Sequence, residues 1–146
     1  FILLNASRYD IKGKALLSST EKYYAVDLGL RNVIKKSEEL DSNKLYENIV
    51  YLEMRSRGYE VQVGKLDDTE IDFICYSGDE KLYIQVSDNI SDEKTFEREV
   101  NPLLQIKDAY PKLVLARIRD EAYQYEGVQI IDIADWLAEQ PSISQK

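Results

Sequence analysis

Apolar and polar positions change their spacing several times along the chain, and each change marks an expected element. Residues 44–57 repeat apolar side chains at helical spacing over most of the circumference, with Ser42 or Asn43 able to cap the helix and Gly58 able to end it. The spacing then shortens to the alternation of strands in three segments, with turns at 64–68 and 77–79: residues 59–63, 70–76 and 81–87. The pattern predicts a buried helix followed by three strands.

The C-terminal part combines a second helical segment with two apolar runs. Residues 92–110 have helical spacing with Ser91 as a cap, and Pro102 is expected to break or kink this helix near Val100. The remaining expected elements are two buried strands and a short final helix, at residues 112–118, 128–133 and 135–139. Strands that alternate with helices favour parallel pairing, so we expect an α/β fold.

The N-terminal part reads as a unit of its own. Lys12 and Gly13 give a hairpin signal between two short apolar segments. The elements expected here are the hairpin arms, a strand, a short helix and a polar linker, at residues 8–11, 14–17, 21–27, 29–36 and 36–43. We therefore expect a small hairpin or wing-like unit at residues 1–36 and a main domain at residues 37–146.

Charge and composition narrow the function classes. The formal net charge is −8, yet residues 1–36 hold seven basic against three acidic residues, which leaves −12 on the remainder. A basic end on an acidic body can meet phosphate or an acidic neighbouring domain, although a solvated basic face is the simpler explanation. Histidine is absent, which excludes histidine triads and histidine-bound zinc.

The expected compartment is the cytoplasm. Cys75 is the single cysteine of the sequence, so no internal disulfide can form, which fits a reducing environment. No stretch approaches the roughly 18 apolar residues that a membrane-spanning helix needs, and no signal peptide is visible. The sequence begins without methionine, and we expect either a fragment of a longer protein or a chain whose start is missing.

Three polar side chains are expected to converge on the helix and strands at the centre of the chain. Glu47 shares an apolar helix face, where a carboxylate is costly unless it is paired or bound to a metal. Asp72 lies between Glu70 and Ile74 on one strand face, with Ile71 and Phe73 on the other.

On the next strand, Leu82, Ile84 and Val86 share one face and Tyr83, Gln85 and Ser87 the other. Antiparallel pairing would bring Gln85 beside Asp72 at one end of the sheet. Two carboxylates and a carbonyl oxygen suit Mg²⁺ or Mn²⁺, with Glu47, Asp72 and Gln85 as the candidate ligands. An ion pair of Glu47 with Arg55, Lys65 or Arg98 is the structural alternative.

These positions resemble the signature of the PD-(D/E)XK nuclease-like superfamily, in which a helix Glu precedes a strand Asp and a Glu/Gln-x-Lys on the next strand. Here they read Glu47, Asp72 and Gln85-Val86-Ser87. Over residues 8–137 the chain also resembles the C-terminal DUF4143 domain of prokaryotic AAA-type ATPases. The segments that carry this resemblance are residues 8–14, 22–31, 45–48, 70–74 and 131–137.

The resemblance implies a restriction-endonuclease-like three-layer core, with a central mixed sheet flanked by helices. It also implies an ATPase module on the N-terminal side in the full-length protein. That module is not within these residues, because Gly13-Lys14 lacks the upstream glycine of a P-loop and Leu66 stands where Gly64-Lys65 would need Ser or Thr.

For the site, the resemblance implies catalytic positions at Glu47, Asp72, Gln85 and Ser87. Ser87 replaces the lysine that would stabilise charge on a phosphate, and no hydroxyl supplies a positive charge. Another cation would have to substitute, and the candidates are Lys65, Lys94 and Arg98.

Three functions remain open, and whether the chain is an enzyme depends on how the site manages without a lysine at Ser87. The first is a nuclease-like accessory domain with a degenerate site, which contacts DNA or another nucleic acid, or a protein. The second is an active divalent-metal-dependent DNA or RNA phosphodiesterase. The third is a pure protein-interaction domain, which the acidic body favours.

Overall fold

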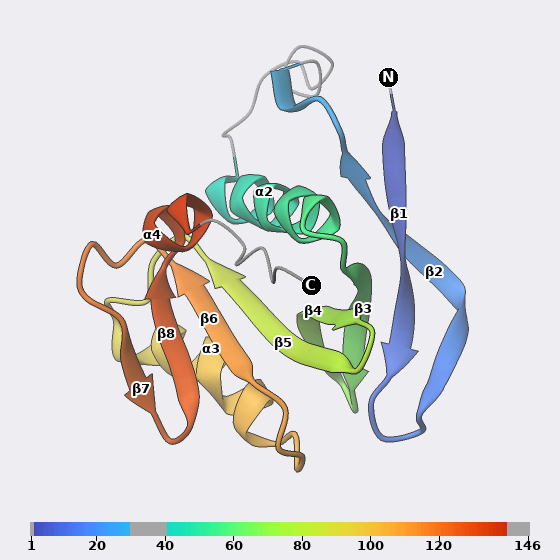
Figure 1. Ribbon diagram of the computed structural model, residues 1–146. Coiled ribbons are helices and arrows are strands. Elements are labelled where there is room, and N and C mark those ends of the chain that lie inside the picture. Colours follow the sequence, from blue (N-terminus) through green and yellow to red (C-terminus); the bar gives the residue numbers. More distant parts are fainter. Residues whose placement is uncertain (1, 30–40, 140–146) are drawn as a thin grey trace.

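The computed structural model describes residues 2–29 and 41–139 of the 146-residue chain. Within them, one eight-stranded mixed sheet has the order β2-β1-β3-β4-β5-β6-β8-β7 (Figure 1). The strands are β1 (Leu3–Asp10), β2 (Ala15–Ala25), β3 (Glu60–Leu66), β4 (Thr69–Ser77), β5 (Glu80–Ser87), β6 (Lys112–Ala116), β7 (Tyr123–Tyr125) and β8 (Val128–Asp132). The β5–β6 and β6–β8 pairs are parallel, as the alternation of elements predicted.

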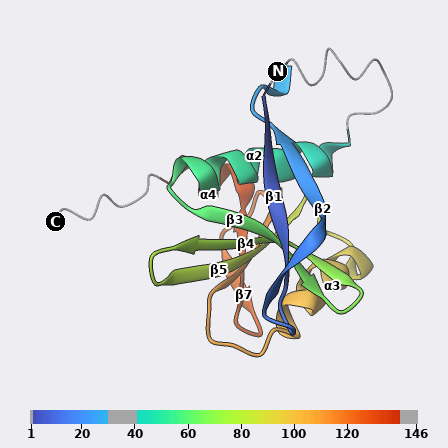
Figure 2. The same ribbon diagram turned by 90° about the vertical axis from the view of Figure 1, so that its right-hand side faces the viewer.

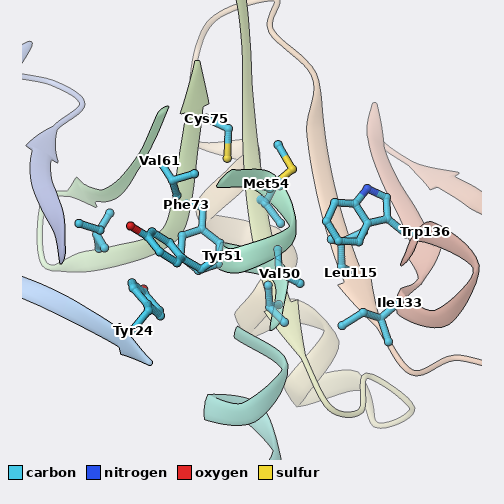
Figure 3. Close-up of a cluster of buried hydrophobic side chains, with 14 residues drawn as sticks. Tyr24, Val50, Tyr51, Met54, Val61, Phe73, Cys75, Leu115, Ile133 and Trp136 are labelled. Carbon is cyan, nitrogen blue, oxygen red and sulfur yellow. The ribbon is translucent and has the colours of Figure 1, made fainter. Parts of the chain in front are cut away.

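Helices cover both faces of the sheet, which confirms an α/β fold with a large mixed sheet flanked by helices (Figures 1 and 2). The helices are α2 (Ser42–Ser56), α3 (Glu93–Leu104) and α4 (Ile133–Ala138). One core cluster joins the sheet to α2 and α4, through side chains such as Tyr51, Phe73 and Trp136 (Figure 3). A second cluster joins the opposite face to α3, through Val100 and Leu103. In the described residues, no helix has the length and apolar character needed to cross a membrane.

The N-terminal hairpin belongs to this sheet instead of standing apart from it. Arg8, Tyr9 and Asp10 of β1 pair in parallel with Val63, Gly64 and Lys65 of β3, which makes β1 and β2 its outermost strands on that side. The strand expected at 21–27 is the second half of β2. Most of the helix expected at 29–36 and of the linker at 36–43 lies outside the described residues.

Two helix boundaries differ from those expected. Asp41 caps α2 by accepting from the Lys44 backbone N–H at 3.3 Å, so Ser42 and Asn43 lie inside the helix. Asp92 caps α3 in the same way, and Pro102 lies within the helix instead of breaking it near Val100. Pro102 stands in the last turn with its ring buried, so the helix forgoes one backbone hydrogen bond shortly before it ends.

A β-bulge in β4 changes which way its side chains face. Gln62 pairs with Ile74 and Gly64 with Ile71, so Asp72 and Phe73 together oppose the single residue between Gln62 and Gly64. Ile71 therefore packs with the α3-side cluster and Phe73 with the α2-side cluster. Sequence alternation had placed these two side chains on one face, because it takes no account of the extra residue.

Gly64 lies inside β3 and not in the expected turn. A Cβ atom there would stand 2.9 Å from the Ile71 Cβ and 3.1 Å from the nearest Ile74 carbons. We expect Gly64→Ala to lower the free energy of unfolding by about 2 kcal/mol in urea denaturation, because the well-packed core would have to shift. Gly78→Ala, where the added atom meets nothing but φ is +58°, gives for comparison the cost of a left-handed backbone, which Gly64 does not have. Unchanged stability of Gly64→Ala would contradict the packing explanation.

Candidate functional site

Three carboxylates meet where α2 crosses the bulged strand. Glu47 comes from α2, and Glu70 and Asp72 from β4. One oxygen of each lies within 4.8 Å of the others. The Glu47 side chain is 13% exposed, so this is a sheltered acidic cluster and not a solvated face. The sequence predicted the meeting of Glu47 and Asp72 but did not include Glu70.

Asp72 and Gln85 connect β4 to β5 where their backbone pairing stops. The ladder ends at Phe73 and Ile84. Beyond it, the Asp72 backbone N–H donates to Gln85 Oε1 at 2.7 Å, and the Val86 backbone N–H donates to Asp72 Oδ2 at 2.8 Å. These side chains thus continue the strand pairing through reciprocal hydrogen bonds. The carbonyl oxygen of Gln85, predicted as a metal ligand, is directed to this backbone N–H.

Lys22 of β2 supplies an ammonium group to the carboxylates. Its Nζ donates to Glu47 Oε1, and it donates to Glu70 Oε1 at 2.9 Å. Arg8 of β1 binds the other carboxylate oxygen of Glu70. In the described residues, the cation that bridges Glu47 and Glu70 is therefore Lys22, and not any of the candidates Lys65, Lys94 or Arg98.

An irregularity in the hairpin positions Lys22. Arg8 pairs with Leu17, whereas Ala6 pairs with Lys22, so four residues of β2 oppose the single residue between Ala6 and Arg8. This long bulge displaces the second half of β2 relative to its first half. The shift brings Lys22 to the same end of the molecule as Glu47 and β4.

Side chains of α2 fasten this part of the hairpin. Asn48 accepts from the Ala25 backbone N–H at 2.9 Å and donates to the Ala25 carbonyl at 2.8 Å. The rings of Tyr24 and Tyr51 stack with centroids 4.1 Å apart, and Tyr51 donates its hydroxyl to the Asn5 carbonyl (Figure 3). These contacts are buried or half-buried, so they hold Lys22 over the carboxylates in a fixed place.

The pKa values show how the charges compensate. Burial disfavours the ammonium of Lys22, but Glu47 and Glu70 more than offset it, so its pKa is raised. Burial likewise disfavours the Glu70 carboxylate, yet Lys22 and Arg8 lower its pKa. The pKa of Asp72 is raised well above its ordinary value by burial and by the charge of Glu47. Asp72 is therefore the carboxylate of the cluster whose negative charge is not compensated by an ion pair.

Ser87 takes no part in this network. It is buried, and its hydroxyl donates to the Asn89 carbonyl at 3.1 Å. Lys65 and Lys94 are exposed. Arg98 pairs with the buried Glu99, whose pKa burial raises and which lies close enough for its charge to raise that of Asp72. The four predicted catalytic positions thus lie on α2, β4 and β5. Three of them are close together, whereas the hydroxyl of Ser87 is hydrogen-bonded outside the carboxylate cluster.

Asp72 has a structural role that substitutions can separate from its charge. Asp72→Asn keeps an oxygen that accepts from Val86 and removes a carboxylate whose raised pKa makes the charged form costly at neutral pH. We expect it to raise the free energy of unfolding at pH 7 by up to about 1 kcal/mol. Asp72→Ala should lower it by about 2 kcal/mol, because the Val86 N–H loses its acceptor.

Urea denaturation between pH 4 and pH 8 tests this pair of variants. Because the folded-state pKa of Asp72 exceeds its unfolded value, protonation favours the folded protein, so the advantage of Asp72→Asn should shrink as the pH falls. Destabilisation by Asp72→Asn equal to that of Asp72→Ala would mean that the charge itself stabilises the fold.

The donor set fits a hard divalent cation in its chemistry. Three carboxylates within a few ångströms are oxygen ligands of the kind Mg²⁺ or Mn²⁺ takes. Glu47, Glu70 and Asp72 would hold such an ion, and the ion would supply Lewis-acid stabilisation of phosphate charge. Lys22 and Arg8, however, already compensate two of the three charges, and Lys22 bridges two of the three ligands.

A comparison with known proteins finds a relative in a bacterium. The chain is 43% identical over 138 residues to a protein of Haemophilus influenzae that is described as an uncharacterized protein. The match covers 94% of this chain and 34% of the relative, so the chain spans about a third of that protein's length. No protein-family model matches the chain. No solved structure matches it either.

Proposed function

We propose that the chain is a nuclease-like accessory domain of a AAA-type ATPase, which binds nucleic acid without cleaving it. The observation that carries this proposal is the position of Lys22, between two of the carboxylates that a catalytic metal would need. The Lys22 ammonium offsets the negative charge of the clustered carboxylates and so stabilises the fold. A bound metal would offset the same charge and would also serve a reaction. The site keeps the arrangement of a metal centre while the chain itself provides the cation.

The neutralised cluster also bears on nucleic-acid binding. Three bare carboxylates would repel a phosphate group, whereas Lys22 and Arg8 leave at most one net negative charge among these five side chains. Protonation of Asp72, whose pKa is raised, would remove that charge as well. A phosphodiester can therefore approach this part of the molecule more easily than the overall charge of −8 suggests.

The proposed ATPase partner rests on the family resemblance. About two thirds of the Haemophilus relative lies outside the match, which leaves room for a further module in a protein of that kind. The resemblance of residues 8–14, 22–31 and 70–74 to the DUF4143 domain implies that such a module would lie on the N-terminal side. The full-length protein would then combine ATP hydrolysis with a nuclease-like domain that contacts nucleic acid in the cytoplasm.

The test is to measure binding and cleavage on the same substrates. Duplex plasmid and single-stranded DNA and RNA are incubated with the protein in Mg²⁺ or Mn²⁺, and the same molecules are used in gel shifts at low salt, where phosphate contacts are strongest. We expect shifts without cleavage. Metal-dependent cleavage that disappears in both Asp72→Ala and Glu47→Gln would overturn the proposal, and so would the lack of any shift, which favours a protein-interaction domain.

An active phosphodiesterase is the second candidate, because Lys22 could act as the missing cation. Glu47, Glu70 and Asp72 would hold the metal, and the Lys22 ammonium beside them would supply positive charge toward a phosphate. Lys22→Met distinguishes the two functions. It abolishes cleavage if Lys22 is catalytic, whereas it frees ligands for a metal if Lys22 only compensates charge.

A further inference from the structure

Three parallel strands end at one level, which begins at Ser87, one residue after the hydrogen bond of Val86 to Asp72. Ser87 of β5 pairs with Ala116 of β6, and Ala116 pairs with Asp132 of β8, so the last residues of all three strands form a row. Binding residues are concentrated in loops that a rigid scaffold positions, such as those that leave the carboxyl ends of parallel strands. The segments that leave this row therefore carry the residues that a ligand would meet.

The segment after β6 is held rigid although it is exposed. The buried carboxylate of Asp132 accepts from the backbone N–H groups of Ile118 at 3.1 Å and Arg119 at 2.8 Å. Arg119 has a φ of 59°, a left-handed conformation that is unfavourable for a non-glycine residue. Strained backbone of this kind persists only where its surroundings fix it, and it is concentrated at functional sites.

A hollow of about 160 Å³ lies beside this segment. Its lining includes Ser91, Arg117, Asp120 and Tyr123. The facing loop after β5 is fixed as well, because Asn89 accepts from the Ser91 backbone N–H at 2.7 Å through its side chain and from the Ser87 hydroxyl through its carbonyl. The volume suits a phosphate with its sugar and leaves the base to lie at the rim.

Arg117 and Tyr123 are the largest polar side chains at the hollow, and they suit a phosphate and a base. The Arg117 side chain is 49% exposed and has one long ion pair, 3.4 Å from Asp88 Oδ1, so most of its N–H donors remain available to a phosphate. Tyr123 is 46% exposed and offers a ring on which a base can stack. Arg117, Asp88 and Asp120 together carry a net charge of −1, which repels additional negative charge and so favours a single phosphate over a polyphosphate.

We infer that this hollow is a nucleotide subsite, in which Arg117 binds a phosphate of a nucleic-acid strand and Tyr123 stacks on the adjacent base. The inference rests on the nucleic-acid binding proposed above and assigns part of it to a second place on the molecule. The loop between β5 and α3 supplies Asn89 and Ser91 to the hollow, and β5 itself carries Gln85, which is hydrogen-bonded to Asp72 of the carboxylate cluster.

Nuclear magnetic resonance titration of the protein with thymidine 5′-monophosphate tests the subsite directly. We expect saturable shifts at residues 89–91 and 117–123, with a dissociation constant of about 1 mM. Thymidine and inorganic phosphate should each bind at least about 10-fold more weakly, and thymidine 5′-triphosphate no more tightly than the monophosphate. The absence of shifts at these residues, or equal binding of inorganic phosphate, would overturn the inference.

Variants connect the subsite to longer nucleic acids and keep the two proposals distinguishable. Arg117→Ala and Tyr123→Ala should each weaken a single-stranded oligonucleotide about 3- to 10-fold, and Arg117→Ala should lower the salt dependence by about one phosphate contact. Lys107→Ala, at a different hollow lined by Tyr110 and Gly127, is the matched loss of a basic side chain and should change neither quantity. Unchanged binding in Arg117→Ala and Tyr123→Ala with a retained gel shift contradicts the subsite alone, whereas a missing gel shift contradicts the proposed function.

Discussion

Lys22→Met should lower the free energy of unfolding by about 2 kcal/mol, because it leaves the sheltered carboxylate of Glu47 without its cation and leaves Glu70 with Arg8 alone. Lys22 is 29% exposed and Glu47 only 13%, so little solvent screens the interaction. Methionine retains the apolar stem of the side chain and removes the ammonium group. The measurement is urea denaturation at pH 7 and low ionic strength.

Lys12→Met is the matched control on the same hairpin. Lys12 also forms an ion pair, with Asp67, but the two side chains are 63% and 58% exposed. An exposed pair of this kind contributes at most about 1 kcal/mol, so the control should be close to wild type. Equal effects of Lys22→Met and Lys12→Met would mean that the carboxylates do not need Lys22.

The pH dependence of the Lys22→Met effect has a definite sign. The raised pKa of Lys22 means that its stabilisation is complete below the unfolded value of about 10.4 and is lost as the pH rises through the folded value. The lowered pKa of Glu70 means that its contribution is complete above about 4.3 and is lost as the pH falls through the folded value. The difference between wild type and Lys22→Met should therefore be largest between about pH 5 and pH 10 and shrink on either side.

Asp132→Ala should lower the free energy of unfolding by about 3 kcal/mol, because one buried carboxylate satisfies four backbone N–H groups. Two belong to Ile118 and Arg119, and two to Ala134 and Asp135 at the start of α4. Asp132 thus caps a helix and fixes the strained segment after β6 at the same time. Asp92→Ala, which removes a cap from α3 only, should cost about 1 kcal/mol.

The charge of Asp132 also gives this prediction a pH window. Hydrogen bonds from Arg119 and its neighbours lower the pKa of Asp132. The stabilisation is therefore present above the unfolded pKa of about 3.9 and lost as the pH falls through the folded value. Asp132→Asn, which offers one acceptor oxygen instead of two, should fall between wild type and Asp132→Ala. A loss in Asp132→Ala no larger than that in Asp92→Ala would contradict the double role.

The central helix and strands could be predicted from the sequence because their apolar pattern is local. Apolar spacing predicted α2 and the three strands after it, and alternation in β5 correctly placed Ile84 and Val86 on the face opposite to Tyr83. The three-residue strand β7 was missed, because Tyr123–Tyr125 is too short to show a period. The bulge at Asp72 was missed because register depends on the partner strand.

Only part of the candidate site could be predicted from the sequence, for a similar reason. Glu47 and Asp72 stood out as charges within apolar segments, and Glu70 lies two positions from Asp72 on the same strand. Lys22 is separated from Glu47 by 25 residues and from Glu70 by 48. Its place depends on the long bulge in β2 and on the contacts of Asn48 with Ala25, which no local pattern predicts. The signal in the sequence that could have pointed to Lys22 is a lysine within a tyrosine-rich strand.

The most direct test of the central claim, that Lys22 takes the place of a metal, is Mn²⁺ binding measured by electron paramagnetic resonance. We expect no specific binding to the wild-type protein at about 1 mM Mn²⁺ and binding at least about 10-fold tighter to Lys22→Met, because the ammonium then no longer occupies Oε1 of Glu47 and Oε1 of Glu70. Glu47→Gln in the Lys22→Met background should abolish the gain. Tight Mn²⁺ binding by the wild-type protein, or none by Lys22→Met, would contradict the claim.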